Sequence, residues 1–89
     1  MSKSYASEVE KFHRELEHYR ATARSNKRRL EDNPFLEKQI AFWIEGTRFF
    51  ISELEIWDQL NNAKECEKTI HKIQGALDRM QHLIDQLVE

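Results

Sequence analysis

The stretch from 34 to 60, PFLEKQIAFWIEGTRFFISELEIWDQL, decides the fold of this 89-residue chain. Its apolar side chains recur at helical spacing and form three parallel rows. These rows are Phe35, Phe42, Phe49 and Ile56; Leu36, Trp43, Phe50 and Trp57; and Ile40, Ile44 and Ile51. Together they span an arc of roughly 240°, far wider than the apolar side of a surface helix. We therefore expect this helix to be covered on several sides.

Another helix is predicted before it, over about 5–30. Ser7 and Glu10 have the spacing of a capping box that opens a helix. The apolar residues that follow form a narrow seam of the coiled-coil type. They are Val9, Phe12, Leu16, Tyr19, Ala23 and Leu30. The helix should stop before Asn33, which can cap the next helix, with Pro34 at the first helical position.

The segment from about 63 to 88 carries an apolar heptad seam. The seam consists of Cys66, Ile70, Ile73, Leu77, Met80, Ile84 and Leu87. Asn61 tolerates the left-handed conformation that ends a helix, and Asn62 can cap a new helix, which favours three helices of about 24 to 28 residues. The alternative stays open, because the seven-residue phase of the Phe35 row runs on through this point without a slip. A continuous helix from 34 to 89 would be about 85 Å long and would expose a complete seam, so it would have to associate.

Composition agrees with a helical protein. Charged residues make up 34% of the chain, whereas Gly occurs twice and Pro once, so the turn residues that sheets need are scarce. We predict one all-α domain over 1–89, either a three-helix bundle or a helical hairpin with long coiled-coil helices, in an oligomer. No window of about 18 residues is apolar enough for a membrane span, and 1–10 lacks the apolar core of a signal peptide. We therefore expect a cytoplasmic protein without membrane contact.

The one cysteine and the distribution of charge add two expectations. Cys66 falls on the apolar seam, where we expect it to pack as a small hydrophobe rather than to react. Residues 1–30 hold eight basic and four acidic side chains, a balance of +4, and residues 31–89 hold six and twelve, a balance of −6. These two parts should attract each other.

Glu10, His13 and Glu17 share one side of the first helix, at the Glu-x-x-His spacing of carboxylate-bridged di-iron proteins. A di-iron site needs a second motif of this kind, which the chain lacks. The three residues also lie outside the apolar seam, beside Arg14 and Arg20, which would repel a cation. We expect a solvated surface with no metal and no cofactor.

Other catalytic chemistry lacks its usual parts. His71 and His82 lie on the polar side of the last segment, with no zinc-site spacing around them. The chain contains no Gly-x-Ser-x-Gly elbow and no glycine-rich phosphate loop. We expect no enzymatic activity.

Basic side chains line one flank of the first helix, a pattern typical of nucleic-acid or anionic-membrane binding. They are Arg14, Arg20, Arg24, Lys27 and Arg28. Glu15 and Glu17 interrupt this basic flank, and the whole chain has a net charge of −2. We favour a solvated flank that pairs with the acidic helices, and we keep weak, salt-sensitive nucleic-acid binding as the alternative function.

The function that the sequence favours is protein–protein interaction, in an adaptor, a chaperone-like protein or a regulatory or inhibitory subunit. Two neighbouring helices of one chain can cover the row that contains Trp43 and one flank of that row. The row that contains Phe42 then stays uncovered. Left in water, its rings would form an exposed apolar patch at or above the size that monomers usually tolerate. We therefore predict that this helix binds a protein partner, a second copy of the chain, or both. The predicted binding residues are Phe35, Phe42, Trp43, Phe49, Phe50 and Trp57.

Overall fold

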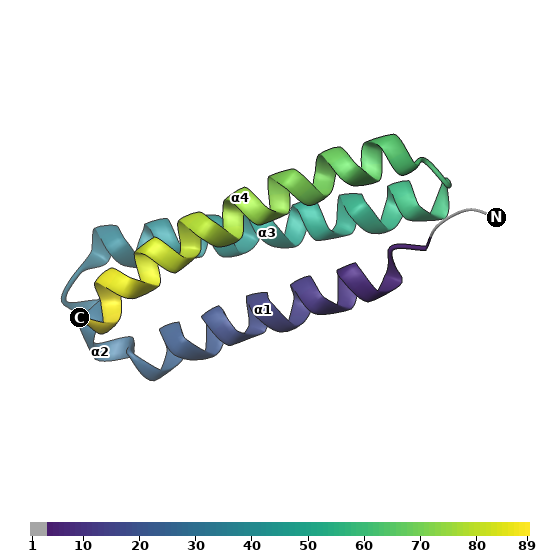
Figure 1. The fold of residues 1–89 in the computed structure, drawn as a ribbon. Helices are drawn as coiled ribbons and strands as arrows, with labels where there is room; N and C mark the ends of the chain where they lie inside the picture. Colours follow the sequence, from purple (N-terminus) through teal and green to yellow (C-terminus); the bar gives the residue numbers. More distant parts are fainter. Residues whose placement is uncertain (1–3) are drawn as a thin grey trace.

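The computed structural model describes residues 4–89, which form helices joined by short turns (Figure 1). The helices are α1 Ala6–Ser25, α2 Lys27–Glu31, α3 Pro34–Gln59 and α4 Ala63–Val88. No strand occurs within residues 4–89, and the predicted all-α class is confirmed. The three long helices lie side by side in a rod of 51 × 18 × 16 Å, with α3 and α4 antiparallel. None of the described helices is apolar enough over a sufficient length to cross a membrane.

A short turn separates α3 from α4, as in the first of the two alternatives. Asn61 has a φ of 56°, in the left-handed region that asparagine tolerates better than most residues. The side chain of Asn62 accepts a hydrogen bond from the backbone N–H of Glu65 at 3.2 Å and so caps α4. The single continuous helix is therefore wrong, and the two halves of the segment fold back on each other. Asn33 caps α3 in the same way, by accepting from the N–H of Leu36.

The first helical segment, expected as one helix, is broken at Asn26. This residue has φ −113° and ψ 31°, and it separates α1 from α2. Its side chain donates a hydrogen bond to the carbonyl oxygen of Thr22 at 2.8 Å, a local bond of the kind through which asparagine competes with the helical ladder. Beyond the bend, Leu30 of α2 belongs to the cluster of buried residues that also contains Leu36 and Leu83.

The start of α1 also differs from the prediction, because Ser7 lies inside the first turn and the residue at the N-cap is Tyr5, whose side chain accepts no capping hydrogen bond. Tyr5 anchors the start instead. Its side chain is buried, its backbone N–H donates to Asp58 Oδ1 at 3.1 Å, and its hydroxyl donates to Glu67 Oε1 at 2.7 Å. The hydrogen bond to Glu67, together with burial, raises the pKa of Tyr5 to about 12. The predicted capping box is therefore wrong: contacts with α3 and α4 fix the start of α1.

The core lies where the inner sides of α1, α3 and α4 meet. The predicted seams supply most of it, and Cys66 is fully buried among them, as expected. Burial raises the pKa of the Cys66 thiol, which disfavours the reactive thiolate. Ile40 and Ile51 of the third row on α3 are also buried.

Two fully buried residues of α3, Thr47 and Leu54, belong to none of the three predicted rows. Thr47 can be buried because its hydroxyl donates to the carbonyl oxygen of Trp43 at 2.7 Å. A matching row on α4 was also missed, and it consists of Thr69, Ala76 and Leu83. The inner surfaces of both helices are therefore wider than the seams alone.

Gly46 lies inside α3 and Gly75 inside α4, at positions where the surrounding space would accommodate a larger side chain. A Cβ atom at either position would meet no atom within 4 Å beyond its own helix backbone and chain neighbours. Glycine inside a helix costs about 0.5–1 kcal/mol relative to alanine. We expect Gly46→Ala and Gly75→Ala each to raise the free energy of unfolding by about this amount in urea denaturation. A loss of stability in Gly75→Ala, the more exposed position of the two, would contradict this expectation.

Candidate partner-binding surface

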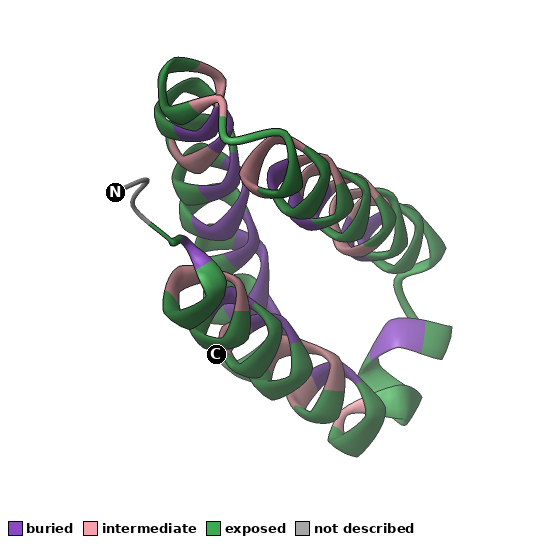
Figure 2. Cartoon of the chain, turned by 90° about the vertical axis from the view of Figure 1, so that its right-hand side faces the viewer, coloured by how far each residue is buried: buried purple, intermediate pink, exposed green. Residues whose placement is uncertain are grey.

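The first row of α3, Phe35, Phe42, Phe49 and Ile56, lies on the outside of the molecule; we call it the apolar stripe. Its side chains are 72, 68, 67 and 56% exposed, in chain order. Figure 2 shows the same division along the long helices, with buried segments turned toward the middle and exposed segments outward. No helix within residues 4–89 covers this row, which agrees with the expectation that two neighbouring helices of the same chain leave the Phe42 row uncovered.

The second row lies between the apolar stripe and the core. Trp43, Phe50 and Trp57 are half-buried and pack against the core cluster. Phe42 meets Trp43 edge-on with ring centres 5.5 Å apart, and Phe49 meets Phe50 with ring centres 6.0 Å apart. Such pairs favour a fixed ring geometry. Of the six predicted binding residues, Phe35, Phe42 and Phe49 are exposed. The other three are half-buried and lie between the exposed row and the core.

Basic residues on α4 follow one another at intervals of four, four and seven, so they share one side of the helix. They are Lys64, Lys68, Lys72 and Arg79, all exposed, and we call them the basic row. The Nζ atom of Lys72 lies 3.5 Å from Glu53 Oε1 and 5.7 Å from the centre of the Phe50 ring. The basic row therefore runs along the side of α4 next to α3.

The acidic residues on the outer surface of α4 lie on its other flank, toward α1. They are Glu67, Asp78 and Asp85. The hydroxyl of Tyr19 on α1 donates to Gln81 Oε1 at 2.8 Å, and Gln81 Nε2 donates to Asp85 Oδ1 at 2.7 Å. Burial raises the pKa of Tyr19, and the charges of Glu15, Asp78 and Asp85 raise it further. Apart from Glu65, which lies 3.5 Å from Lys68 on the basic side, the charged side chains on the surface of α4 are divided by sign between its two flanks.

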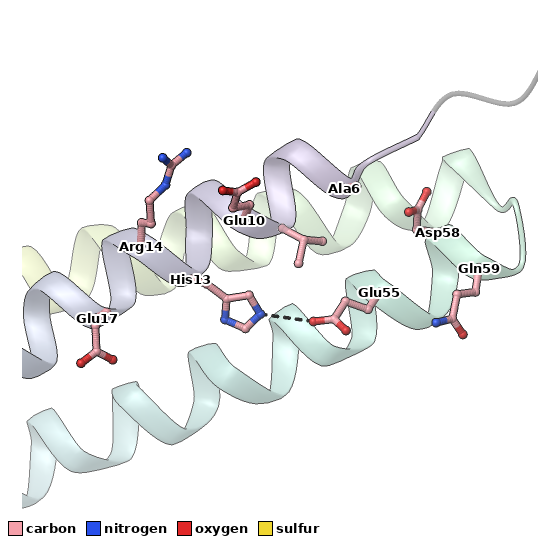
Figure 3. A pocket seen from close by; sticks show the side chains of 9 residues that line it. Ala6, Glu10, His13, Arg14, Glu17, Glu55, Asp58 and Gln59 are labelled. Carbon is pink, nitrogen blue, oxygen red and sulfur yellow. Dashed lines mark hydrogen bonds and ion pairs between the residues drawn. The ribbon is translucent and has the colours of Figure 1, made fainter.

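A groove of about 660 Å³ runs between α1 and the C-terminal part of α3 (Figure 3). His13 Nε2 lies 3.2 Å from Glu55 Oε1 across it, and Glu10 and Glu17 of the same helix also line the groove. Glu10, His13 and Glu17 are all exposed. Among residues 4–89 no three His, Cys, Asp or Glu side chains gather as a metal site would need. The Glu-x-x-His spacing therefore brings no ligand cluster together, and His71 and His82 are exposed on α4.

The basic flank of the first segment is divided by the bend at Asn26. Arg14, Arg20 and Arg24 belong to α1, and Lys27 and Arg28 belong to α2. Glu17 Oε2 lies 3.6 Å from Arg20 Nη1, and Glu17 Oε1 lies 3.8 Å from Arg24 Nη2. We predicted that this flank pairs with the acidic helices. For these two arginines the prediction is wrong, because both pair with Glu17 of their own helix.

The apolar stripe stands out from the rest of the described surface. Of the six large apolar side chains exposed in residues 4–89, four belong to it, and the other two are Leu60 and Val88. No protein-family model, curated protein or solved structure matches this chain.

Proposed function

We propose that this chain is a protein-interaction module that binds a helix of another chain through the apolar stripe of α3. The exposure of Phe35, Phe42 and Phe49, about two-thirds of each side chain, supports the proposal. A phenylalanine presents about 150–250 Å², so the exposed parts of the three rings amount to roughly 300–500 Å². Ile56 and Leu60 extend this patch. The largest apolar patch on a typical monomer is about 300–600 Å² and is often functional.

The spacing of the stripe suits a helical partner. Its residues recur every two turns, about 10.5 Å apart, and the row extends for about 32 Å along α3. Heptad rows of this kind pack between the side chains of a second helix. Together with its polar flanks, a helix docked over this length approaches the roughly 800 Å² per partner of a standard interface.

The test removes the two central rings in the variant Phe42→Ser with Phe49→Ser. Because both side chains are mostly exposed, we expect the helix content and the free energy of unfolding to stay close to those of the wild type. Light scattering should show a lower mass if the wild type self-associates, and binding of a partner helix should be lost. Circular dichroism on the same samples measures helix content.

The control variant is Glu37→Ser with Arg48→Ser, two exposed positions on α3 outside the stripe. It removes one charge of each sign and should behave as the wild type does. The proposal is wrong if the wild type is a monodisperse monomer that binds no helix. It is equally wrong if the double phenylalanine variant unfolds, because the stripe would then belong to the core.

A further inference from the structure

We propose that the partner at this surface is an amphipathic helix with an acidic flank. Its apolar side would lie along the apolar stripe of α3, and its acidic side chains would face the basic row of α4. This inference rests on the proposed function and adds the chemistry of the partner.

The apolar stripe and the basic row lie on the same outer side of the α3–α4 pair, away from α1. Lys72 reaches Phe50 and Glu53, and Thr69 Oγ1 of α4 also donates to Glu53 Oε1 at 3.4 Å. These contacts set the antiparallel register of the two helices. Helical spacing then brings Lys68 level with the end of the stripe at Ile56, and Arg79 level with its middle. The basic row therefore accompanies the stripe over about half its length.

The acidic groups on this side of the molecule are already engaged by the chain itself. Glu53 Oε1 lies 3.5 Å from Lys72 Nζ and accepts from Trp57 Nε1 at 3.4 Å, and Glu65 Oε1 lies 3.5 Å from Lys68 Nζ. Both lysine side chains remain about half exposed, at 58% for Lys68 and 51% for Lys72. Each ammonium group has three donors, so one carboxylate leaves donors for a partner. A partner helix with an acidic flank therefore complements the basic row, whereas one with a basic flank is repelled by it.

A second copy of this chain complements the apolar stripe and the basic row less well. In an antiparallel two-fold pair of α3 helices, equivalent flanks meet, so the two basic rows would lie on the same side of the interface. In a parallel pair, the basic row would meet the other flank of α3. Both signs occur there, with the acidic Glu37, Glu45 and Glu55 interrupted by the basic Lys38 and Arg48. Neither arrangement supplies a continuous acidic flank, so the charges favour a different chain.

The experiment uses two 21-residue helical peptides with the same leucine heptad face, one with glutamate flanks and one with lysine flanks. Fluorescence anisotropy measures their binding to the full chain in 50 mM salt. We expect the acidic peptide to bind at least tenfold more tightly, and the preference to shrink as salt rises. Reversal of two charges in the variant Lys68→Glu with Arg79→Glu should weaken the acidic peptide about tenfold. The control, Arg14→Glu with Arg24→Glu, makes the same change in net charge on α1 and should stay within twofold of the wild type.

The variant Phe42→Ser with Phe49→Ser separates failure of this inference from failure of the proposed function. If both peptides bind equally and both are lost in this variant, the stripe binds helices and the acidic partner is overturned. If peptide binding survives in this variant, the proposed function fails as well. Three other results overturn the acidic partner: no binding of either peptide, a wild-type mass of two chains that neither peptide dissociates, or displacement of the acidic peptide by an oligonucleotide or by anionic vesicles.

Discussion

Replacing Ile51 with alanine should lower the free energy of unfolding by about 2–5 kcal/mol, whereas replacing Ile56 should lower it by less than about 1 kcal/mol. Both substitutions remove the same atoms from the same helix. Ile51 is 0% exposed in the core, and Ile56 is 56% exposed in the apolar stripe. The first change leaves a cavity among packed side chains, and the second removes a group that water already contacts. Since a domain has a total stability of about 5–15 kcal/mol, the loss at Ile51 is a large fraction of it.

Urea denaturation followed by far-ultraviolet circular dichroism measures both variants, at two protein concentrations and with a shared slope against urea. Similar losses for Ile51→Ala and Ile56→Ala would contradict the assignment of Ile56 to the surface of the folded unit. Losses at Ile56 that grow as the protein is concentrated would mean that folding and association through the stripe are coupled.

The double substitution Asn61→Ala with Asn62→Ala should have the second large effect, because it removes both local causes of the α3–α4 turn. Loss of the Asn62 cap costs about 1 kcal/mol, and alanine in the left-handed conformation of Asn61 costs about another 1–2 kcal/mol. The seven-residue phase runs through this turn unbroken, so a continuous helix keeps its apolar seams in line. We expect part of the protein to form exchanged dimers in which α3 and α4 are one long helix.

Light scattering should detect the dimer by its doubled mass, and small-angle scattering should show a maximum dimension well beyond the 51 Å length of the rod. Asn61→Gly is the control, because glycine adopts the left-handed conformation without strain and should keep the hairpin. A double variant that stays monomeric at wild-type stability would show that packing between α3 and α4, and not the asparagines, makes the turn.

The parts of the fold that depend on local chemistry could be predicted from the sequence. Asn33 and Asn62 cap α3 and α4 because a side-chain oxygen near a free N–H needs no distant partner. The heptad seams became the core for a similar reason, since helical spacing alone places their residues on one side. The exposure of the Phe42 row followed from geometry as well: a helix with two neighbours in its own chain has one side left over.

The remaining features depend on contacts between segments far apart in the chain. Tyr5 starts α1 through bonds to α3 and α4, and nothing in the neighbouring sequence indicates them. Thr47 is buried at the centre of α3 only because its hydroxyl turns back onto the helix. The spacing of the basic row of α4 is visible in the sequence, but the sequence does not show which helix the row lies beside. The contact of Lys72 with Phe50 places it next to α3. The function of a charged side of a helix depends on which other helix it lies beside.

The placement of the apolar stripe and the basic row on α3 and α4 has a consequence for the order of events during folding. These two helices are consecutive in the chain and joined only by residues 60–62, so their pairing requires closure of a very short loop. Contacts of this local kind form early, whereas docking of α1 onto α4 must bring together segments separated by most of the chain. Because α1 packs on the other side of the α3–α4 pair, the hairpin of α3 and α4 presents the whole docking surface before α1 docks. A partner present at that moment would therefore meet a finished surface on a chain whose own core is still open.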